Sequence, residues 1–387
     1  MADGSDVVVV GGGVIGAACA RELAERGVQV TLIERAELAG AASGRNLGLW
    51  STPYDPMLVP MARAGLQSYL AIVDDAPLPV FLDREAIGIL STIGEEEKEA
   101  AQVDRDAAAA VGVTSEHLDP QQLRRLEPEL RPDLAGAWLL HDGHRLDPAA
   151  LTVALALRAK ELGAVIRHHL SVRALLRQGD RVAGVATDEG TVEAGTVVLA
   201  AGPWSQDLLR TLDLRIPITG ARGWLVRLRP PRTLISHWIE GAARSLFRAS
   251  VGEVAAGAFA EGVPEPDVGT MLQPAPDGSI VAGASRQAVV TNEPDDAGVP
   301  HAIVRGAISM LPALAEAAVV SAWWGVRPMS PDERPLVGRL AEGLIVATGH
   351  GSEGVILAAG TGQLVAAAIT GDEPPFNPAP FDPGRFA

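Results

Sequence analysis

The sequence of 387 residues predicts an α/β protein in which one domain contains a parallel sheet and a second, α+β domain contains an antiparallel sheet. Three observations support this prediction. A buried strand runs into a glycine-rich turn and a helix near the N-terminus, and a second strand, turn and helix of the same kind lie near the C-terminus. Between them, residues 214–322 carry short alternating runs separated by turn signals. The first domain is therefore expected to be discontinuous.

The N-terminal unit has the pattern of a Rossmann-like dinucleotide site. Residues 6–10 are a β-branched run typical of a buried parallel strand, and residues 11–16 satisfy G-x-G-x-x-G. A helix is predicted over 14–26, and a strand over 28–33 ends at Glu34. The glycines permit a tight turn and the close approach of a pyrophosphate, which the free N–H groups and dipole of the helix attract. Glu34 is placed to accept hydrogen bonds from a ribose.

The middle of the chain mixes helices with short strands. The small-residue loop 39–46, AGAASGRN, is typical either of a flexible linker or of a backbone pressed against a flat cofactor. Helices are predicted over 95–111 and 148–163, and the second has an Asp-Pro start and a glycine stop. A small antiparallel meander is predicted from strand-like runs over 165–169, 171–176, 181–187 and 191–192.

Two further buried strands are assigned to the first domain. One covers residues 197–201 and runs into a Gly-Pro-Trp turn. The other covers residues 344–348 and leads through the glycine-rich turn 349–354 into a very apolar helix over 355–369. Because this unit repeats the pattern of the N-terminus, the C-terminal residues are expected to return to the nucleotide-binding sheet.

Composition excludes several classes of protein. With 32 basic and 48 acidic residues, the net charge of −16 argues against binding to nucleic acid or to an anionic membrane. No apolar run approaches the roughly 18 residues of a membrane span, and the acidic start does not resemble a signal peptide, so we expect a cytoplasmic protein. Cys19 is the only cysteine, which excludes an internal disulfide, and the histidines lack matching carboxylate spacing, so no metal site is expected.

Six segments, in order from end to end, resemble the family of FAD-dependent amino-acid and amine oxidoreductases of the D-amino-acid oxidase type. Glycine oxidase and sarcosine oxidase are the members that look most similar. The resemblance implies an FAD-binding domain of the glutathione-reductase type over 1–80, 142–213 and 322–387, and a substrate-binding domain over 81–141 and 214–321. The six segments are VVVVGGGVIGAACARELAERGVQVTLIER, AASGRN, HRLDPAALTVAL, VVLAAGPWS, WWGVRPMSPDERPLVG and IVATGHGSEGVILAAGTGQLVA.

The resemblance also implies which residues hold FAD. The glycine turn would hold the pyrophosphate, Glu34 and Arg35 would flank the ribose, and Val172 would meet the adenine. The loop from 43 to 48 would wrap the flavin, and the turn at 350–356 would place a helix dipole beside its pyrimidine. The implied cofactor-binding residues are Gly11, Gly13, Val14, Ile15, Gly16, Glu34, Arg35, Ser43, Arg45, Asn46, Leu47, Gly48, Val172, Ala201, Gly202, Trp204, His350, Gly351, Ser352, Glu353, Gly354, Val355 and Ile356.

Non-covalent FAD is expected. Cys19 lies in the predicted nucleotide-binding helix, so it does not match the C-terminal cysteine that tethers the flavin in monomeric sarcosine oxidase. That relative also uses a lysine over the flavin, whereas the only two lysines here, Lys98 and Lys160, lie on predicted surface helices. The shortage of lysine favours the glycine-oxidase branch of the family, and it also keeps a dehydrogenase open as an alternative.

By resemblance, Arg327 in the segment GVRP occupies the position at which the family clamps a substrate carboxylate. A fork-shaped guanidinium suits a bidentate carboxylate, and the alternative is an ion pair with Asp332 or Glu333. In this interpretation Arg327 is the catalytic residue. Three side chains are weaker candidates for the substrate pocket: Arg286, His350 and Arg248.

Departures from the family bear on the substrate. Ser352 stands where glycine oxidase carries a second arginine, which weakens the case for specificity toward glycine alone. We expect a pocket of aliphatic and tryptophan side chains that suits an N-substituted or larger apolar amine. The candidate tryptophans are Trp50, Trp224 and Trp238.

The resemblance implies oxidation of the C–N bond of an amino acid or secondary amine, of which glycine and N-substituted glycines are the first choice. Hydride would pass to flavin N5, water would hydrolyse the imine, and oxygen would be reduced to hydrogen peroxide. The expected partners are thus a small-molecule substrate and oxygen, and a homo-oligomer is left open. Two alternatives also stay open: an FAD subunit of a heteromeric dehydrogenase that passes electrons to a partner protein, and an NAD-dependent reductase.

Overall fold

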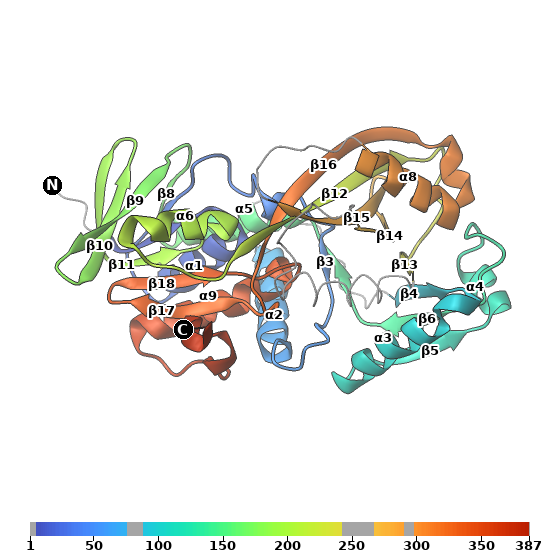
Figure 1. The fold of residues 1–387 in the computed structure, drawn as a ribbon, viewed down its shortest axis with the longest axis horizontal. Helices are drawn as coiled ribbons and strands as arrows, with labels where there is room; N and C mark the ends of the chain where they lie inside the picture. The colour runs from blue at the N-terminus through green and yellow to red at the C-terminus, as the bar shows by residue number, and fades with distance from the viewer. Residues whose placement is uncertain (1–4, 76–87, 242–266, 290–297, 387) are drawn as a thin grey trace.

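The computed structural model describes residues 5–75, 88–241, 267–289 and 298–386, and it has a large sheet toward each end of an elongated molecule (Figure 1). The central strands of the first sheet pair in parallel, whereas the second sheet is mainly antiparallel. This arrangement confirms the predicted α/β fold class with a second sheet domain. Within the described ranges, no helix has the length and hydropathy that crossing a membrane requires.

The first sheet has the order β17-β18-β11-β1-β2-β8, and β10 and β9 extend it from β11. Its strands are β1 (Ser5–Val10), β2 (Val30–Ile33), β8 (Val165–Arg167), β9 (Val172–Gln178), β10 (Arg181–Thr187), β11 (Gly190–Leu199), β17 (Leu336–Ala341) and β18 (Leu344–Thr348). The helices that accompany it are α1 (Val14–Glu25), α2 (Val59–Asp75), α5 (Pro148–Glu161), α6 (Ser205–Leu209) and α9 (Gly354–Thr370).

Both faces of β1 are buried, which explains its unbroken valine run. Val7 and Val9 pack into a core with α1, α2, α5 and α9, while Val8 and Val10 pack into a second core with residues from β9, β10 and α6. A strand covered on both faces needs no polar alternation. The N-terminal strand β1 therefore lies inside the first sheet, between β11 and β2, and the glycine turn follows it directly.

Two glycines of α9 allow its neighbouring helices to approach closely. A methyl group at Gly362 would lie 2.7 Å from the main-chain oxygen of Ala18 in α1. One at Gly360 would lie 2.5 Å from the main-chain oxygen of Met61 in α2. Because real Cβ atoms do not approach that closely, α9 is packed tightly between these helices, and its N-terminal turn is held in a fixed place.

The structure corrects the predicted strands before the Gly-Pro-Trp turn. Residues 191–192 and 197–201 were expected to be separate, but they belong to the continuous strand β11 or follow it directly. The first half of β11 pairs antiparallel with β10, and its second half pairs parallel with β1. One strand therefore pairs first with β10 and then with β1. The sequence has no turn signal between the two halves of β11.

The second sheet has the order β16-β12-β15-β14-β13-β4-β6-β5. Its strands are β4 (Gly88–Ile93), β5 (Ser115–Leu118), β6 (Gly136–His141), β12 (Thr219–Arg229), β13 (Trp238–Gly241), β14 (Asp267–Pro274), β15 (Ile280–Val289) and β16 (Ala318–Met329). Nearby lie α3 (Lys98–Ala110), α4 (Pro120–Leu126) and α8 (Gly298–Met310). Of these three helices, the sequence patterns predicted only α3. A further short pair joins β3 (Leu49–Trp50) to β7 (His144–Arg145).

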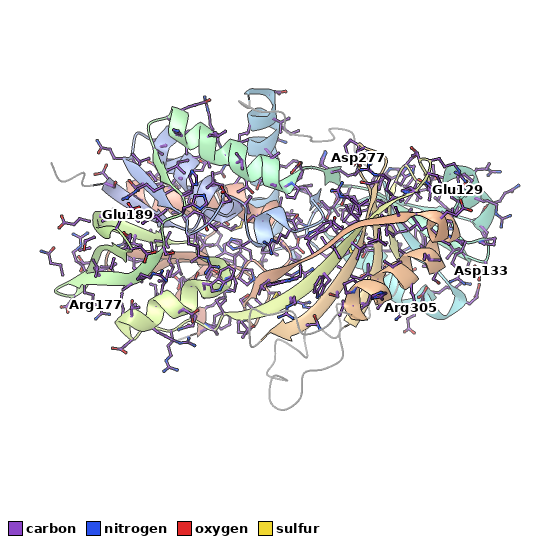
Figure 2. All side chains as sticks on the ribbon, turned by 90° about the horizontal axis from the view of Figure 1, so that it is seen from above. Glu129, Asp133, Arg177, Glu189, Asp277 and Arg305 are labelled. Atoms are coloured by element: carbon purple, nitrogen blue, oxygen red, sulfur yellow. The ribbon has the colours of Figure 1, made fainter. Side chains whose placement is uncertain are left out.

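The longest strand, β16, extends from the second sheet toward the first (Figure 1). It pairs with β12 from Ala318 to Met329, and Met329 makes a bridge to His350 beside α9. The domain boundary expected between residues 321 and 322 falls inside this strand. Charged side chains lie at both ends of the molecule, as Figure 2 shows for Arg177 and Glu189 at one end and Glu129, Asp133 and Arg305 at the other.

Candidate functional site

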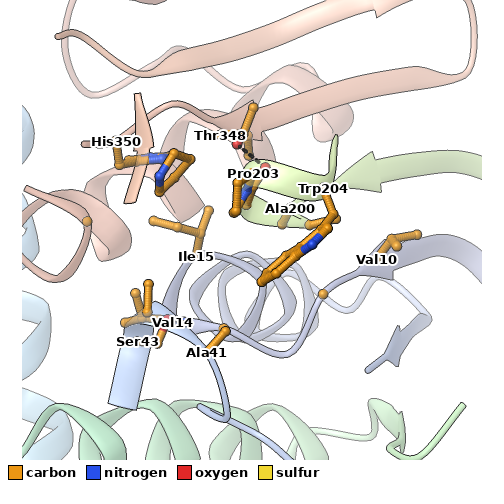
Figure 3. A pocket seen from close by; sticks show the side chains of 18 of the residues that line it. Val10, Val14, Ile15, Ala41, Ser43, Ala200, Pro203, Trp204, Thr348 and His350 are labelled. Atoms are coloured by element: carbon orange, nitrogen blue, oxygen red, sulfur yellow. Dashed lines mark hydrogen bonds between the residues drawn. The ribbon is translucent and has the colours of Figure 1, made fainter. Parts of the chain in front are cut away.

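One cavity of about 390 Å³ lies at the carboxyl ends of the strands of the first sheet (Figure 3). Val10 of β1, Ile33 of β2, Ala200 after β11 and Thr348 of β18 line it, together with the first turns of α1 and α9 and the end of β16. Parallel strands present their carboxyl ends at one edge of a sheet, where α/β proteins bind their ligands. The cavity thus brings together residues from almost the whole length of the chain.

The glycine turn forms one wall of this cavity. Gly11 has a φ of +113°, and a methyl group on it would lie 2.4 Å from the main-chain oxygen of Ala200. The Val14 N–H, in the first turn of α1, donates to the Ser43 hydroxyl over 2.9 Å. Backbone N–H groups, a helix N-terminus and a hydroxyl therefore meet at one place, which suits a phosphate group.

Acidic and aromatic groups shape the cavity beyond the glycine turn. Glu34 accepts hydrogen bonds from the Gly12 N–H at 2.6 Å and the Ala36 N–H at 2.9 Å, which fixes its carboxylate at the end of β2. The Arg35 guanidinium, just after β2, lies 3.9 Å from the centroid of the Trp204 ring in the turn after β11, and both side chains line the cavity. This end offers acceptors for hydroxyl groups beside a flat cation–aromatic pair.

The other end of the cavity lies between β16 and α9. Arg327 and Pro328 line it from β16, and the Gly351 N–H donates to the Pro328 main-chain oxygen over 2.8 Å. The N-terminus of α9, at Gly354, lines the same region and directs its positive dipole end there. A guanidinium and a helix N-terminus thus make this end favourable for negative charge.

His350 lies in the wall at this end of the cavity, as Figure 3 shows. Its side chain is buried, its Nε2 is 2.9 Å from the Thr361 hydroxyl, and its Nδ1 has no hydrogen-bond partner. Burial lowers the pKa of His350 to about 3. The imidazole is therefore neutral near pH 7 and contributes no positive charge to the cavity.

We expect His350→Gln to reduce the loss of stability in acid. The folded chain keeps His350 neutral, while the unfolded chain binds a proton below the ordinary pKa of 6.5. The resulting stabilisation is complete above pH 6.5 and is lost as the pH falls toward 3, by about 1.4 kcal/mol per pH unit. Denaturant unfolding at pH 7 and pH 5 should show that the variant loses about 2 kcal/mol less than the parent.

The exposed His117, changed to glutamine in the same way, is the matched control for this measurement. It should leave the difference between pH 7 and pH 5 as it is in the parent. Equal acid sensitivity in the parent and in His350→Gln would contradict the assignment of a buried, neutral imidazole.

Most residues implied for the cofactor line this cavity. Arg327 lines it as well, so the implied substrate clamp and the glycine turn belong to one continuous space. The cofactor candidates that line it are Gly11, Gly13, Val14, Ile15, Glu34, Arg35, Ser43, Asn46, Val172, Ala201, Gly202, Trp204, His350, Gly351, Ser352, Gly354 and Val355.

Four other cofactor candidates do not line the cavity. A methyl group on Gly16 would be 1.9 Å from the Gly11 main-chain oxygen, so Gly16 lets α1 pack on the turn. Leu47 packs among apolar side chains of the second sheet, and Ile356 is buried in the core of the first. Gly48 has a φ of +74° and faces the backbone at residue 146.

Several charged candidates also lie outside the cavity. The Arg45 guanidinium donates to the Trp324 main-chain oxygen over 3.2 Å and faces a separate open groove. Arg286 lies 3.4 Å from a Glu333 carboxylate oxygen. Glu353 precedes α9 as its N-terminal cap residue. Arg248 lies outside the described residues. Trp50, Trp224 and Trp238 were expected in the pocket, but none of them lines it.

Sequence reasoning missed part of the lining. Ile33, Ala347 and Thr348 could have been found, because each lies at or near the carboxyl end of a predicted parallel strand. The Thr348 hydroxyl donates to the Gly202 main-chain oxygen over 2.9 Å and so ties two of these ends together, as Figure 3 shows. Val10 and Ala200 could have been found in the same way, because they lie at the ends of the predicted strands 6–10 and 197–201. No local pattern distinguishes the other missed residues, which are Ala41, Ala42, Leu170, Arg173, Pro203, Asp207, Leu208 and Pro328.

Two histidines have a carboxylate neighbour that sequence spacing did not predict. Glu37 lies 2.9 Å from His169 Nε2 and 3.9 Å from His168 Nδ1. The three candidate ligand atoms lie within 4.8 Å of one another, and all three side chains are exposed. Glu37 is more than 130 residues from the two histidines in the sequence, so spacing could not reveal this contact, and the absence of a metal site stays a prediction.

A comparison with known families matches residues 6–368 to the family described as FAD dependent oxidoreductase (DAO). Among individual proteins, the chain is 28% identical to the glycine oxidase of Pseudomonas aeruginosa over 98% of this chain and 99% of that one. It is similar in structure to the glycine oxidase from Bacillus cereus, with a TM-score of 0.82, 29% identity, and coverage of 95% of this chain and 96% of that one.

Other relatives are longer than this chain. It is 31% identical to the 4-methylaminobutanoate oxidase (formaldehyde-forming) of Paenarthrobacter nicotinovorans over 98% of this chain but 45% of that protein. It is 28% identical to the bifunctional protein ThiO/ThiG of a Nostoc species over 94% of this chain and 52% of that one. The chain thus spans about half the length of these curated relatives.

Proposed function

This chain belongs to the family of FAD dependent oxidoreductases, and on that premise we propose that it oxidises the C–N bond of an amino acid or secondary amine. A glycine or an N-substituted glycine is the proposed substrate, and oxygen is the proposed electron acceptor. One observation carries the proposal: Arg327 lines the same cavity as the glycine turn and the N-terminus of α9. A group that binds carboxylates therefore lies within the space that suits the cofactor.

The residues of the cavity fit FAD. Gly11, Gly13 and Val14 would hold the pyrophosphate, because they line the cavity at the N-terminus of α1. The turn is too tight for side chains at the two glycines, which would meet Ala200 or Ser43 at 2.4–2.9 Å. The fixed Glu34 carboxylate would accept the ribose hydroxyls. When bound, FAD supplies a hydride acceptor. The buried Cys19 does not line the cavity, so the only cysteine of the chain cannot tether a cofactor there.

The chain's own contribution to the reaction would be binding and orientation. Arg327 would hold the carboxylate of the substrate and so fix the α-carbon in one place. His350 is neutral and leaves the positive charge to Arg327 and the N-terminus of α9. Among the described residues, the Arg327 end of the cavity has no acidic lining residue, which agrees with loss of hydride from a neutral amine and later hydrolysis of the imine by water.

The face of the second sheet that carries Arg327 also carries apolar side chains, which would suit a substrate larger than glycine. Leu225, Val281 and Ala284 form a buried cluster with Leu47 and Trp323. Leu225 projects from the same face of the second sheet as Arg327. Ala221 is the partner of Arg327 on β12, and Leu225 is four residues after Ala221, so the alternation along the strand puts both on one face. The names of two relatives, glycine oxidase and 4-methylaminobutanoate oxidase, also point to amine substrates.

The flavin-loaded protein is expected to form hydrogen peroxide in air when given N-methylglycine, and to turn it over at least as well as glycine. Peroxide and glyoxylate release, measured over a range of both substrates, tests this expectation. If kcat/KM for free glycine exceeds that for N-methylglycine by more than about tenfold, which corresponds to 1.4 kcal/mol, the proposal of an N-substituted substrate is contradicted.

A second function is an FAD subunit of a heteromeric dehydrogenase. Over 88% of its length the chain is 29% identical to a protein of Escherichia coli that is named as one subunit of the anaerobic glycerol-3-phosphate dehydrogenase, and it spans 60% of that protein. Substrate-dependent reduction of an artificial dye without peroxide formation would favour this function over the oxidase. A protein that reduces neither oxygen nor dye with any amine would contradict both.

A further inference from the structure

The Arg327 guanidinium lies across the neighbouring strand β12 at Gly223. Arg327 pairs with Ala221 on β12, and Gly223 pairs with Gly325 on β16, so all four residues belong to one face of the sheet. A methyl group on Gly223 would lie 2.1 Å from Nη1 of Arg327 and 2.7 Å from both Cζ and Nη2. The guanidinium therefore occupies the space in which any other residue at position 223 would place its side chain.

An irregularity between β12 and β15 supplies a second contact for the guanidinium. The register shifts between the Arg222–Gln287 pair and the Val226–Ala282 pair. Within this interval the Ser285 hydroxyl, instead of a strand carbonyl, accepts the Trp224 N–H over 2.9 Å. The main-chain oxygen of the same buried serine accepts Nη1 of Arg327 over 3.3 Å. At this register shift, the main-chain oxygen of Ser285 therefore accepts a hydrogen bond from the guanidinium that lies over Gly223.

Gly325, the glycine opposite Gly223, allows the loop that borders the cavity to approach β16 closely. A methyl group on Gly325 would lie 3.3 Å from Cβ of Arg45 and 3.5 Å from Cα of Ala42. Ala42 lines the cavity. The Gly223–Gly325 pair therefore forms a depression in which the Arg327 guanidinium and the 42–45 loop both lie.

We propose that Gly223 is a positioning residue, and that its missing side chain sets where Arg327 holds the substrate carboxylate. This inference rests on the proposed function, because it assumes that Arg327 binds a carboxylate. A methyl group at position 223 would displace the guanidinium from the main-chain oxygen of Ser285. The fold would be kept, because the atoms that must move belong to the far end of a flexible side chain and not to the backbone.

Acetate binding to the flavin-loaded protein tests this proposal, since acetate carries the carboxylate without the amine. The dissociation constant, measured from the flavin absorbance difference spectrum, should rise about tenfold to a hundredfold in Gly223→Ala, the effect of losing one or two bonds to a charged group. Flavin content should stay as in the parent. Gly269→Ala is the matched control, because it adds the same methyl group to the same sheet with no atom within 4 Å.

A double-mutant cycle separates positioning from general damage to the sheet. In the Arg327→Ala background the clash is gone, so Gly223→Ala should change acetate affinity by less than about twofold. If Gly223→Ala binds acetate as tightly as the parent while Arg327→Ala loses acetate binding, the proposed role of Gly223 is overturned. The carboxylate clamp of the proposed function would then still stand. Unchanged affinity in Arg327→Ala would overturn the carboxylate clamp of the proposed function, and the role of Gly223 with it.

Discussion

Arg327→Ala should lower kcat/KM for a carboxylate-bearing amine by about a hundredfold to a thousandfold while flavin content stays constant. The guanidinium lines the cavity between β16 and α9, apart from the glycine turn that would hold the pyrophosphate. Its removal takes away the charge-assisted bonds to the carboxylate and also the orientation that they impose on the α-carbon. Steady-state kinetics on the flavin-loaded variant, with flavin counted from the visible spectrum, measures both effects.

Two further variants make this result interpretable. Arg327→Lys keeps the charge without the fork and should recover only part of the loss, because a point charge does not fix a bidentate geometry. Arg227→Ala removes an arginine of β12 that contacts Asp277 and Ser279 and lies outside the cavity, so its kinetics should match the parent. Loss of flavin in Arg327→Ala would show that the residue serves the cofactor and not the substrate.

Gly11→Ala should strongly weaken flavin binding. The residue has a φ of +113°, which a side chain tolerates poorly, and the added methyl group would lie 2.4 Å from the Ala200 main-chain oxygen. Since that oxygen belongs to backbone, β1 and the residue after β11 would have to separate, and the cavity would lose its shape at the turn. The bound flavin per chain after gel filtration should fall at least about tenfold, given a combined cost above 1.4 kcal/mol.

Gly163→Ala is the control for backbone strain. Gly163 follows α5 with a φ of +101°, but nothing lies within 4 Å of the position that its methyl group would take. The variant should therefore be destabilised by about 1 kcal/mol through its dihedral angle alone and should keep its flavin. If both variants lose flavin equally, strain rather than the close approach at Gly11 would be the cause.

The elements nearest the glycine turn could be predicted from sequence, because their signals are local. A β-branched run, three spaced glycines and one acidic residue occupy fewer than 35 positions, and the structure places β1, α1 and Glu34 accordingly. The same holds for α5, where the Asp147 carboxylate accepts the Ala149 and Ala150 N–H groups at the predicted start. Each of these features depends on neighbours along the chain.

The rest depends on contacts between distant residues. The lining by Leu170, Asp207 and Leu208 follows from how β9, β11 and α6 pack beside β1, which no local pattern encodes. The exclusion of Arg286 from the cavity follows from its position near Glu333, 47 positions later in the chain. The resemblance found Arg327 by position, but the glycine beneath its guanidinium became visible only when β12 and β16 were paired.

The continuous strand β16 has a consequence for building hybrid enzymes from this fold. It begins beside Arg229 in the second sheet, carries Arg327, and ends at Met329 in a bridge to His350. A junction placed at 321/322, where the sequence puts a domain boundary, would take the two halves of this strand from different parents. Exchanges of the substrate-side sheet should therefore leave residues 318–351 in one piece, so that the arginine and the turn before α9 are inherited together.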